Sequence, residues 1–249
     1  MRFRKFLKPY KTRGSSFREH TLIQRGEQME EQRVSDWRSY CVTLVLLVFN
    51  IVGYILCTQM GEVVYTMGSM NAEKIIAGHE YYRFLTSIFL HADIEHLVSN
   101  MIFLFGLGQM VEQVVGHVSF GIVYLLSGFG GSISSVFYAV WTGKVYHSVG
   151  ASGAIFGVVG ALFVLVIVRE LKNRSHRQDA VEILDQDGVE VPITYESISV
   201  QRLIFAVVYM IYPGSWEVGV DNAAHVGGFI CGIVVMAVIN MVNTGGYKR

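Results

Sequence analysis

A serine set among small residues opens one of the apolar stretches of this chain. Residues 148–157 read SVGASGAIFG, with Ser152 at the centre. Gly150 and Gly153 let the backbone approach closely, and Gly153 with Gly157 forms a G-x-x-x-G face that favours tight helix packing. On this motif alone, packing within a membrane helix is the simplest interpretation.

Two histidines in other apolar stretches point to chemistry instead. His96 opens the sequence HLVSN, which ends at Asn100, and His225 lies in the sequence AHVGG. A polar group inside a membrane segment is costly and is usually functional. An imidazole that accepts the proton of a serine hydroxyl turns its oxygen into a nucleophile. We therefore expect Ser152 to act as a nucleophile and His225 as its base.

The composition is that of a helical membrane protein. The 249 residues are 52% hydrophobic, the mean hydropathy is +0.41 and only three residues are proline. These values favour an all-α polytopic membrane protein. Six apolar runs, of which the second and fifth are interrupted or short by hydropathy alone, predict six transmembrane helices, roughly at 39–59, 94–112, 118–141, 152–168, 198–213 and 223–243.

The basic residues are distributed unevenly along these spans. Threaded through six helices, seventeen of the twenty Lys and Arg residues fall on one side, and only Lys74, Arg83 and Lys144 fall on the other. The positive-inside rule then places both termini in the cytoplasm.

Spans and charge together divide the chain into three parts. A basic cytoplasmic arm (1–38) precedes a membrane domain (39–243), and a short cytoplasmic tail (244–249) follows it. A polar insert at about 173–197 interrupts the membrane domain. Two short apolar stretches in this insert flank DQDG at 185–188, which is typical of a β-hairpin, although a solvated connecting loop is the commoner structure for such a segment.

Helix geometry places the candidate groups at one depth. At about 1.5 Å per residue, Ser152 and His96 each lie roughly 24 Å from the inner end of their spans, and His225 lies about 22 Å from the end of its own. In a hydrocarbon core of about 30 Å, all three lie several Å below the outer surface. A serine–histidine dyad at that depth also needs water, so we expect a solvated cavity open to the outer face.

Two groups on the second span and one on the fourth could stabilise an oxyanion. The side chains of His96 and Asn100 point in from the second span, and the backbone N–H of Gly153 follows the serine directly. Small residues on the fourth and sixth spans would let Ser152 and His225 meet.

Across residues 39–243 the chain resembles the rhomboid family of intramembrane serine proteases. The family pattern G-x-S-G matches residues 150–153, A-H-x-x-G matches 224–228, and H-x-x-x-N matches 96–100. In place of the family's Trp-Arg, the first outer loop has Tyr82-Arg83. The resemblance implies a six-helix rhomboid-like bundle, and it implies these roles: Ser152 as nucleophile, His225 as base, His96 and Asn100 at the oxyanion, Phe156 stacked on the imidazole and Gly150 as a supporting residue.

This resemblance implies an endopeptidase that cleaves single-pass or polytopic membrane proteins in or next to their transmembrane helix. We expect it in the lipid bilayer of a bacterial plasma (inner) membrane, without a nucleic-acid partner. The alternative is a rhomboid-like pseudoenzyme that binds membrane-protein clients without cutting them, against which the retained Ser152 and His225 argue. A transporter is a third option, although the sequence shows no repeated half.

Other titratable residues receive simpler interpretations. No H-E-x-x-H motif occurs, which disfavours a metalloprotease. We expect no metal and no cofactor. Asp221 fits a helix N-cap better than the third member of a triad. His91 is interpreted as a structural hydrogen-bonding group and the three cysteines as packing thiols. The remaining histidines are interpreted as incidental: His20, His79, His117, His147 and His176.

The orientation can be tested with single cysteines in a background without the native ones. Cysteines introduced at Ser175 and at Ser215 fall on opposite sides of the membrane in the six-span prediction. In intact cells an impermeant thiol reagent should label only the cysteine at 215, and disruption of the membrane should expose the other. Equal labelling of both from outside would contradict the six-span arrangement.

Overall fold

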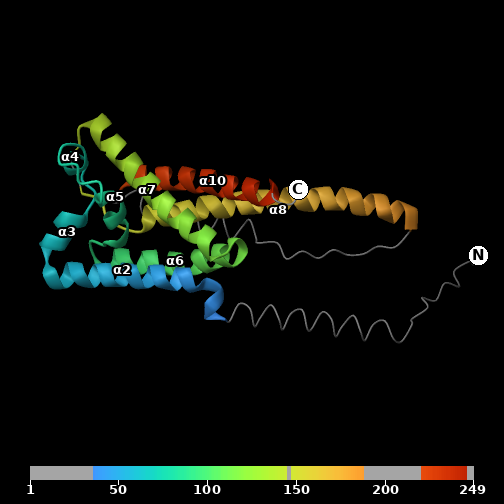
Figure 1. Cartoon of the computed structure of the whole chain (residues 1–249), viewed down its shortest axis with the longest axis horizontal. Helices are drawn as coiled ribbons and strands as arrows, with labels where there is room; N and C mark the ends of the chain where they lie inside the picture. Colours follow the sequence, from blue (N-terminus) through green and yellow to red (C-terminus); the bar gives the residue numbers. More distant parts are fainter. Residues whose placement is uncertain (1–35, 145–146, 188–219, 246–249) are drawn as a thin grey trace, which may run out of the picture. The chain divides into compact units, whose positions relative to one another are not determined.

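The computed structural model of the chain describes residues 36–144, 147–187 and 220–245 (Figure 1), with side chains up to 171 in the second range and up to 243 in the third. Within these ranges the chain is helical, and extended pairing is limited to one bridge between Met70 and Ser148. The elements are η1 (Trp37–Tyr40), α2 (Cys41–Met60), α3 (Glu62–Gly68), α4 (Ala72–Ile76), α5 (Arg83–Thr86), η2 (Ser87–Phe89), α6 (Ile94–Val115), α7 (His117–Thr142), α8 (Ser152–Asp187) and α10 (Asn222–Gly245).

Five segments in the described part of the chain are long and apolar enough to cross a membrane. They are Trp37–Met60, Ile94–Val115, His117–Thr142, Ser152–Leu171 and Asn222–Asn243. The predicted spans at 39–59, 94–112, 118–141, 152–168 and 223–243 are therefore confirmed as helices. The predicted fifth span, 198–213, lies outside the described residues.

Both structures considered for the polar insert, the connecting loop and the hairpin, are wrong for the part of it that the structure describes. Helix α8 continues without a break through Asp187, so residues 173–187 form neither a strand nor a loop. The sequence holds no glycine or proline between Gly160 and Gly188, and nothing there interrupts helical hydrogen bonding. The second predicted arm, at 189–191, lies outside the described residues.

Helix α2 obtains its N-terminal cap from another helix. Its N-cap residue, Tyr40, makes no side-chain capping bond. Instead the buried carboxylate of Glu112, near the end of α6, accepts hydrogen bonds from the backbone N–H of Val42 at 2.8 Å and of Thr43 at 2.7 Å, and from the Thr43 hydroxyl at 2.7 Å. A negative charge at a helix N-terminus is also favourable because of the helix dipole. This contact fixes α2 against α6.

The hydrophobic core is centred on α8. Ile155, Val158 and Leu162 on α8 are at most 1% exposed and pack with side chains of α6 and α7, among them Leu104 and Tyr124. Moving such a side chain from water into a protein core stabilises the folded state by about 1.5–3 kcal/mol. In lipid, which is as apolar as the core, these side chains stabilise the bundle mainly through close packing.

The outward faces of the helices are apolar as well. On α2, Val45, Val48, Val52 and Ile55 are each between 44% and 57% exposed. Apolar exposure of this kind is unfavourable in water and suits hydrocarbon. With five segments of this kind in the described ranges alone, the protein is a multi-pass integral membrane protein.

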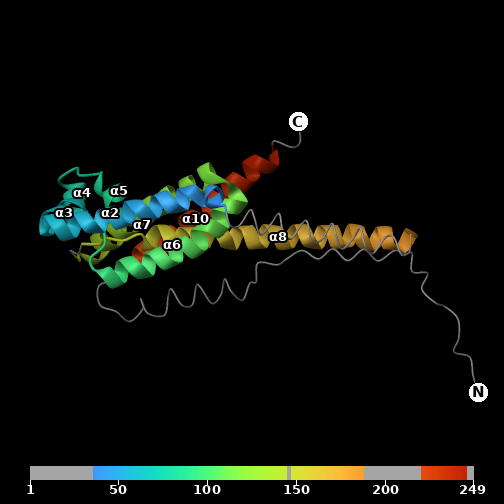
Figure 2. The same cartoon turned by 90° about the horizontal axis from the view of Figure 1, so that it is seen from below.

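Helices α8 and α10 lie side by side (Figures 1 and 2), and their backbones approach unusually closely. A Cβ atom added at Gly228 would lie 2.0 Å from the carbonyl oxygen of Gly153, and one added at Gly232 would lie 2.0 Å from that of Gly157. Across this contact no side chain larger than hydrogen fits at Gly228 or Gly232.

Gly232→Ala should therefore destabilise the bundle. Overpacking costs about 1–3 kcal/mol in a rigid core, which exceeds the gain in helix propensity on replacing glycine. Gly106→Ala is the matched control, because that glycine is also helical and a Cβ there meets nothing within 4 Å. Thermal unfolding in detergent should show a lowered midpoint for the first variant only. Equal stability of both variants would mean that α8 and α10 are not in this contact.

Candidate active site

Ser152 and His225 face each other across the contact between α8 and α10. Ser152 is the first residue of α8 and His225 lies in the first turn of α10. The Ser152 Oγ and His225 Nε2 atoms are 2.9 Å apart, a distance at which the hydroxyl can donate to the imidazole. Both residues are half-buried, so solvent has only partial access to the pair.

The imidazole of His225 is stacked on an aromatic ring. The centroids of the Phe156 and His225 rings are 4.3 Å apart and the planes are inclined by 17°. Phe156 lies one turn beyond Ser152 on α8, so one helix supplies both the hydroxyl and the ring that restricts the imidazole. This is the stacking that the resemblance implied for Phe156.

The start of α10 is held by Asp221. One carboxylate oxygen accepts a hydrogen bond from the Ala224 backbone N–H at 3.0 Å, which is the N-cap geometry predicted from the sequence. The other oxygen accepts a short hydrogen bond from the Ser135 hydroxyl of α7. Asp221 thus ties the turn that carries His225 to α7.

Gly150 brings the chain before Ser152 against the second span. Its φ of +126° is a conformation that side-chain-bearing residues rarely adopt, and its N–H donates to the Ser87 carbonyl at 2.9 Å. A Cβ added there would lie 2.6 Å from His96 Cε1 and 3.5 Å from Asn100 Nδ2. The structure therefore places the predicted residues His96 and Asn100 next to the backbone that leads into α8.

A neutral histidine holds the amide of Asn100. Asn100 Nδ2 donates to Nε2 of His91 at 3.1 Å, and both side chains are buried. Burial, reinforced by nearby His96, lowers the pKa of His91 to about 3, so the ring is neutral at neutral pH. Because the Asn100 amide donates to Nε2, the single hydrogen of this neutral ring lies on Nδ1. The ring of His96 packs edge-on against that of His91, with centroids 5.1 Å apart. His91 is the structural hydrogen-bonding group that we predicted.

The loop before Ser152 is fastened by contacts that sequence reasoning missed. His147, interpreted as incidental, contacts the Ser69 hydroxyl at 2.9 Å and the Asn71 amide at 3.3 Å through its two ring nitrogens. Next to it, the backbones of Ser148 and Met70 exchange two hydrogen bonds. No local pattern marks these partners, because they lie more than seventy residues apart in the chain.

Arg83 organises the segment that this loop contacts. It is only 4% exposed and donates to the carbonyl oxygens of Thr66 at 2.8 Å and Ser69 at 2.9 Å. Its Nε donates to Glu80 at 2.7 Å, which holds the pKa of that carboxyl below its usual value. Arg83, the first residue of α5, thus has a structural role, because it links α5 to the end of α3. Its neighbour Tyr82 is about half exposed.

The arrangement has the parts that acyl transfer requires. A hydroxyl lies beside an imidazole, the imidazole is held by a ring, and an amide and a second histidine lie near the backbone before the hydroxyl. The first N–H groups of α8 have no partner within their own helix, which makes them suitable donors to a negative oxygen. Such donors stabilise the charge that develops when a hydroxyl attacks a carbonyl.

Comparison with known proteins identifies the family. Residues 78–241 match the Rhomboid domain, which is more than half of the chain. The chain therefore belongs to the rhomboid family.

Three relatives illustrate the similarity. RHOMBOID-like protein 4 of Arabidopsis thaliana is 32% identical over 68% of this chain and 37% of its own length. RHOMBOID-like protein 6, mitochondrial, of the same plant is 31% identical over 74% of this chain and 52% of its own length. Rhomboid protease GluP of Bacillus subtilis is 31% identical over 71% of this chain and 29% of its own length. The chain thus spans about half or less of the length of these relatives.

The close contact at Gly150 gives a test of the site. Gly150→Ala would push a methyl group against His96 and strain the backbone before Ser152, and a displacement of about 1 Å can slow a reaction roughly 10²-fold. Gly143→Ala is the control, because Gly143 also has a positive φ, of +66°, but its Cβ meets nothing within 4 Å. We expect the first variant alone to react slowly with a fluorophosphonate at Ser152. Similar labelling rates for both variants would show that Gly150 does not help to position Ser152.

Proposed function

We propose that this protein is an intramembrane serine endopeptidase that uses Ser152 and His225 as a catalytic dyad. The observation that carries the proposal is the 2.9 Å approach of Ser152 Oγ to His225 Nε2, with Phe156 stacked on the imidazole. Membership of a family that includes a named bacterial protease supports it.

In the proposed reaction the Ser152 oxygen attacks the carbonyl carbon of a substrate peptide bond while His225 takes the hydroxyl proton. The negative oxygen of the tetrahedral intermediate accepts hydrogen bonds from the Asn100 amide, from His96 and from the backbone N–H of Gly153. His225 then returns the proton to the leaving amine, and an acyl enzyme remains. Water, activated by the same imidazole, hydrolyses the ester and restores the serine.

The proposed substrates are single-pass or polytopic membrane proteins, cut in or next to a transmembrane helix. A helical peptide bond is hydrogen-bonded within its own helix and cannot enter the site without local unwinding. Substrates should therefore carry small or helix-breaking residues near the cut, because these residues lower the cost of unwinding.

The proposed topology has six spans with both termini in the cytoplasm and the site near the outer face. It rests on the distribution of the basic residues and on the predicted span at 198–213. We propose the bacterial plasma membrane as the location. Two of the similar proteins come from a plant, and one of them is named as mitochondrial. The membrane that holds this protein therefore does not follow from the proposed chemistry.

The dyad can be tested with a fluorophosphonate and a transmembrane substrate. Ser152→Ala and His225→Ala should each lower cleavage at least about 10³-fold, and the serine variant should not be labelled at all. Ser99→Ala is a suitable control, because this exposed hydroxyl on α6 bonds only a backbone carbonyl within the described residues, and it should behave as wild type.

Unchanged far-ultraviolet circular dichroism would show that the variants fold. Labelling that persists in Ser152→Ala would refute Ser152 as the nucleophile. A folded wild-type protein that is neither labelled nor active on several substrates, but still binds them, would support the pseudoenzyme instead.

A further inference from the structure

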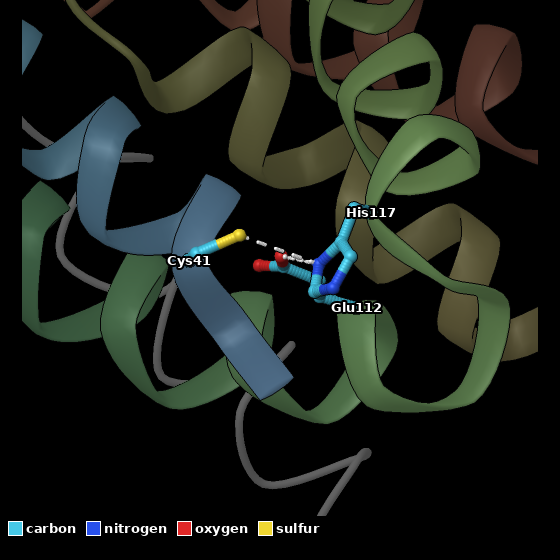
Figure 3. A group of neighbouring side chains, drawn as sticks. All are labelled: Cys41, Glu112 and His117. Atoms are coloured by element: carbon cyan, nitrogen blue, oxygen red, sulfur yellow. Dashed lines mark hydrogen bonds and ion pairs between the residues drawn. The ribbon is translucent and has the colours of Figure 1, made fainter. Parts of the chain in front are cut away.

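Three side chains gather at the end of the bundle away from Ser152. Cys41 is the first residue of α2, Glu112 lies in the last turn of α6, and His117 is the first residue of α7. Figure 3 shows the thiol, the carboxylate and the imidazole turned toward one another from three helices. Asn100 lies twelve residues before Glu112 on α6, so this cluster is about 18 Å from the candidate active site along that helix.

The ligand atoms of this cluster are close enough to share one ion. Cys41 Sγ and His117 Nδ1 are 3.6 Å apart, His117 Nδ1 and Glu112 Oε1 are 2.6 Å apart, and all three atoms lie within 4.8 Å of one another. In a tetrahedral zinc site, with metal–ligand distances of about 2.0–2.3 Å, ligand atoms are about 3.3–3.6 Å from each other. The sulfur–nitrogen distance already fits, and the nitrogen–oxygen distance must open by less than about 1 Å.

A single proton does not satisfy this arrangement. His117 Nδ1 carries at most one hydrogen, yet it faces both the carboxylate and the sulfur. If that hydrogen is donated to Glu112, the thiol of Cys41 has no acceptor at Nδ1, and the reverse holds for the other tautomer. A divalent cation at the same place would bind all three atoms at once.

Glu112 can bind a cation without giving up its role at α2. Its Oε2 accepts the two bonds from Thr43, and its Oε1 accepts one bond from the Val42 N–H. The remaining lone pair of Oε1 now faces His117 and would face the ion instead. Occupancy would thus add a link between helices and leave the cap intact.

Exposure provides a path for the ion and a position for water. The side chain of His117 is 48% exposed, that of Glu112 is 0% exposed, and Cys41 is half-buried. The ion would therefore be held from one side and open on the other, where water can complete four ligands. A set of one sulfur, one nitrogen and one oxygen favours zinc over magnesium or calcium.

We propose that Cys41, Glu112 and His117 form a zinc-binding site that joins the start of α2 to the corner between α6 and α7. Binding would release the thiol proton and leave the imidazole hydrogen on Nε2. The bound ion would resist separation of these three helix ends, and so stabilise the scaffold on which α6 carries Asn100. Cys41 and His117, interpreted from the sequence as a packing thiol and an incidental histidine, would then be ligands.

Cobalt gives a direct test, because a cobalt–thiolate bond absorbs in the near ultraviolet and tetrahedral cobalt absorbs in the visible. The full chain, purified without a polyhistidine tag and treated with a chelator, should gain both bands with one equivalent of Co²⁺ and lose them when Zn²⁺ is added. Cys41→Ser should abolish the near-ultraviolet band, and His117→Gln should abolish or strongly weaken both.

Matched controls distinguish this site from adventitious binding. Cys57→Ser, Cys231→Ser and His79→Gln change other thiols and another exposed imidazole, and should bind as wild type does. Zn²⁺ should raise the thermal midpoint of wild type and of these controls, but not that of folded Cys41→Ser or His117→Gln. Absence of the bands in wild type, or their persistence in folded Cys41→Ser, would overturn the proposal.

Discussion

The close approach of α8 to α10 is the constraint on which the candidate site depends. Gly228 and Gly232 of α10 lie against the backbone of α8, where an added Cβ would come within 2.0 Å of a carbonyl oxygen. The same contact sets the distance between Ser152 and His225 one turn away. Because a hydrogen bond weakens steeply beyond its normal length, even a methyl group between these helices would separate the hydroxyl from the imidazole.

Buried polar groups set the register of the remaining helices. Glu112 of α6 caps α2, and Asp221 joins the start of α10 to α7 through Ser135. Asn50 of α2 contacts the hydroxyl of Tyr124 of α7 at 3.3 Å. Apolar packing in lipid is tolerant of sliding, because one hydrocarbon contact replaces another. An unsatisfied polar group in the same place is costly, so each of these bonds specifies one relative position of two helices.

The site also depends on a segment that does not cross the membrane. Between α2 and α6, buried Arg83 holds neighbouring carbonyl groups together, and His147 and Ser148 attach the loop before α8 to this segment. The backbone at Gly150, with its φ of +126°, is thereby held close to His96. The position of the Ser152 hydroxyl therefore depends both on the contact between α8 and α10 and on the contacts of this outer segment.

The sequence alone determined five of the apolar helices and the N-cap at Asp221, because apolar run length and helix capping are local properties. It failed in the polar insert, where the first apolar stretch considered as a hairpin arm, 181–184, is part of α8, which is helical through Asp187. Only the tertiary structure decided which helix faces meet, and hence that the imidazole lies 2.9 Å from the hydroxyl and that His117 meets Glu112. The physical reason is that such contacts join residues distant in the chain, and their geometry follows from packing.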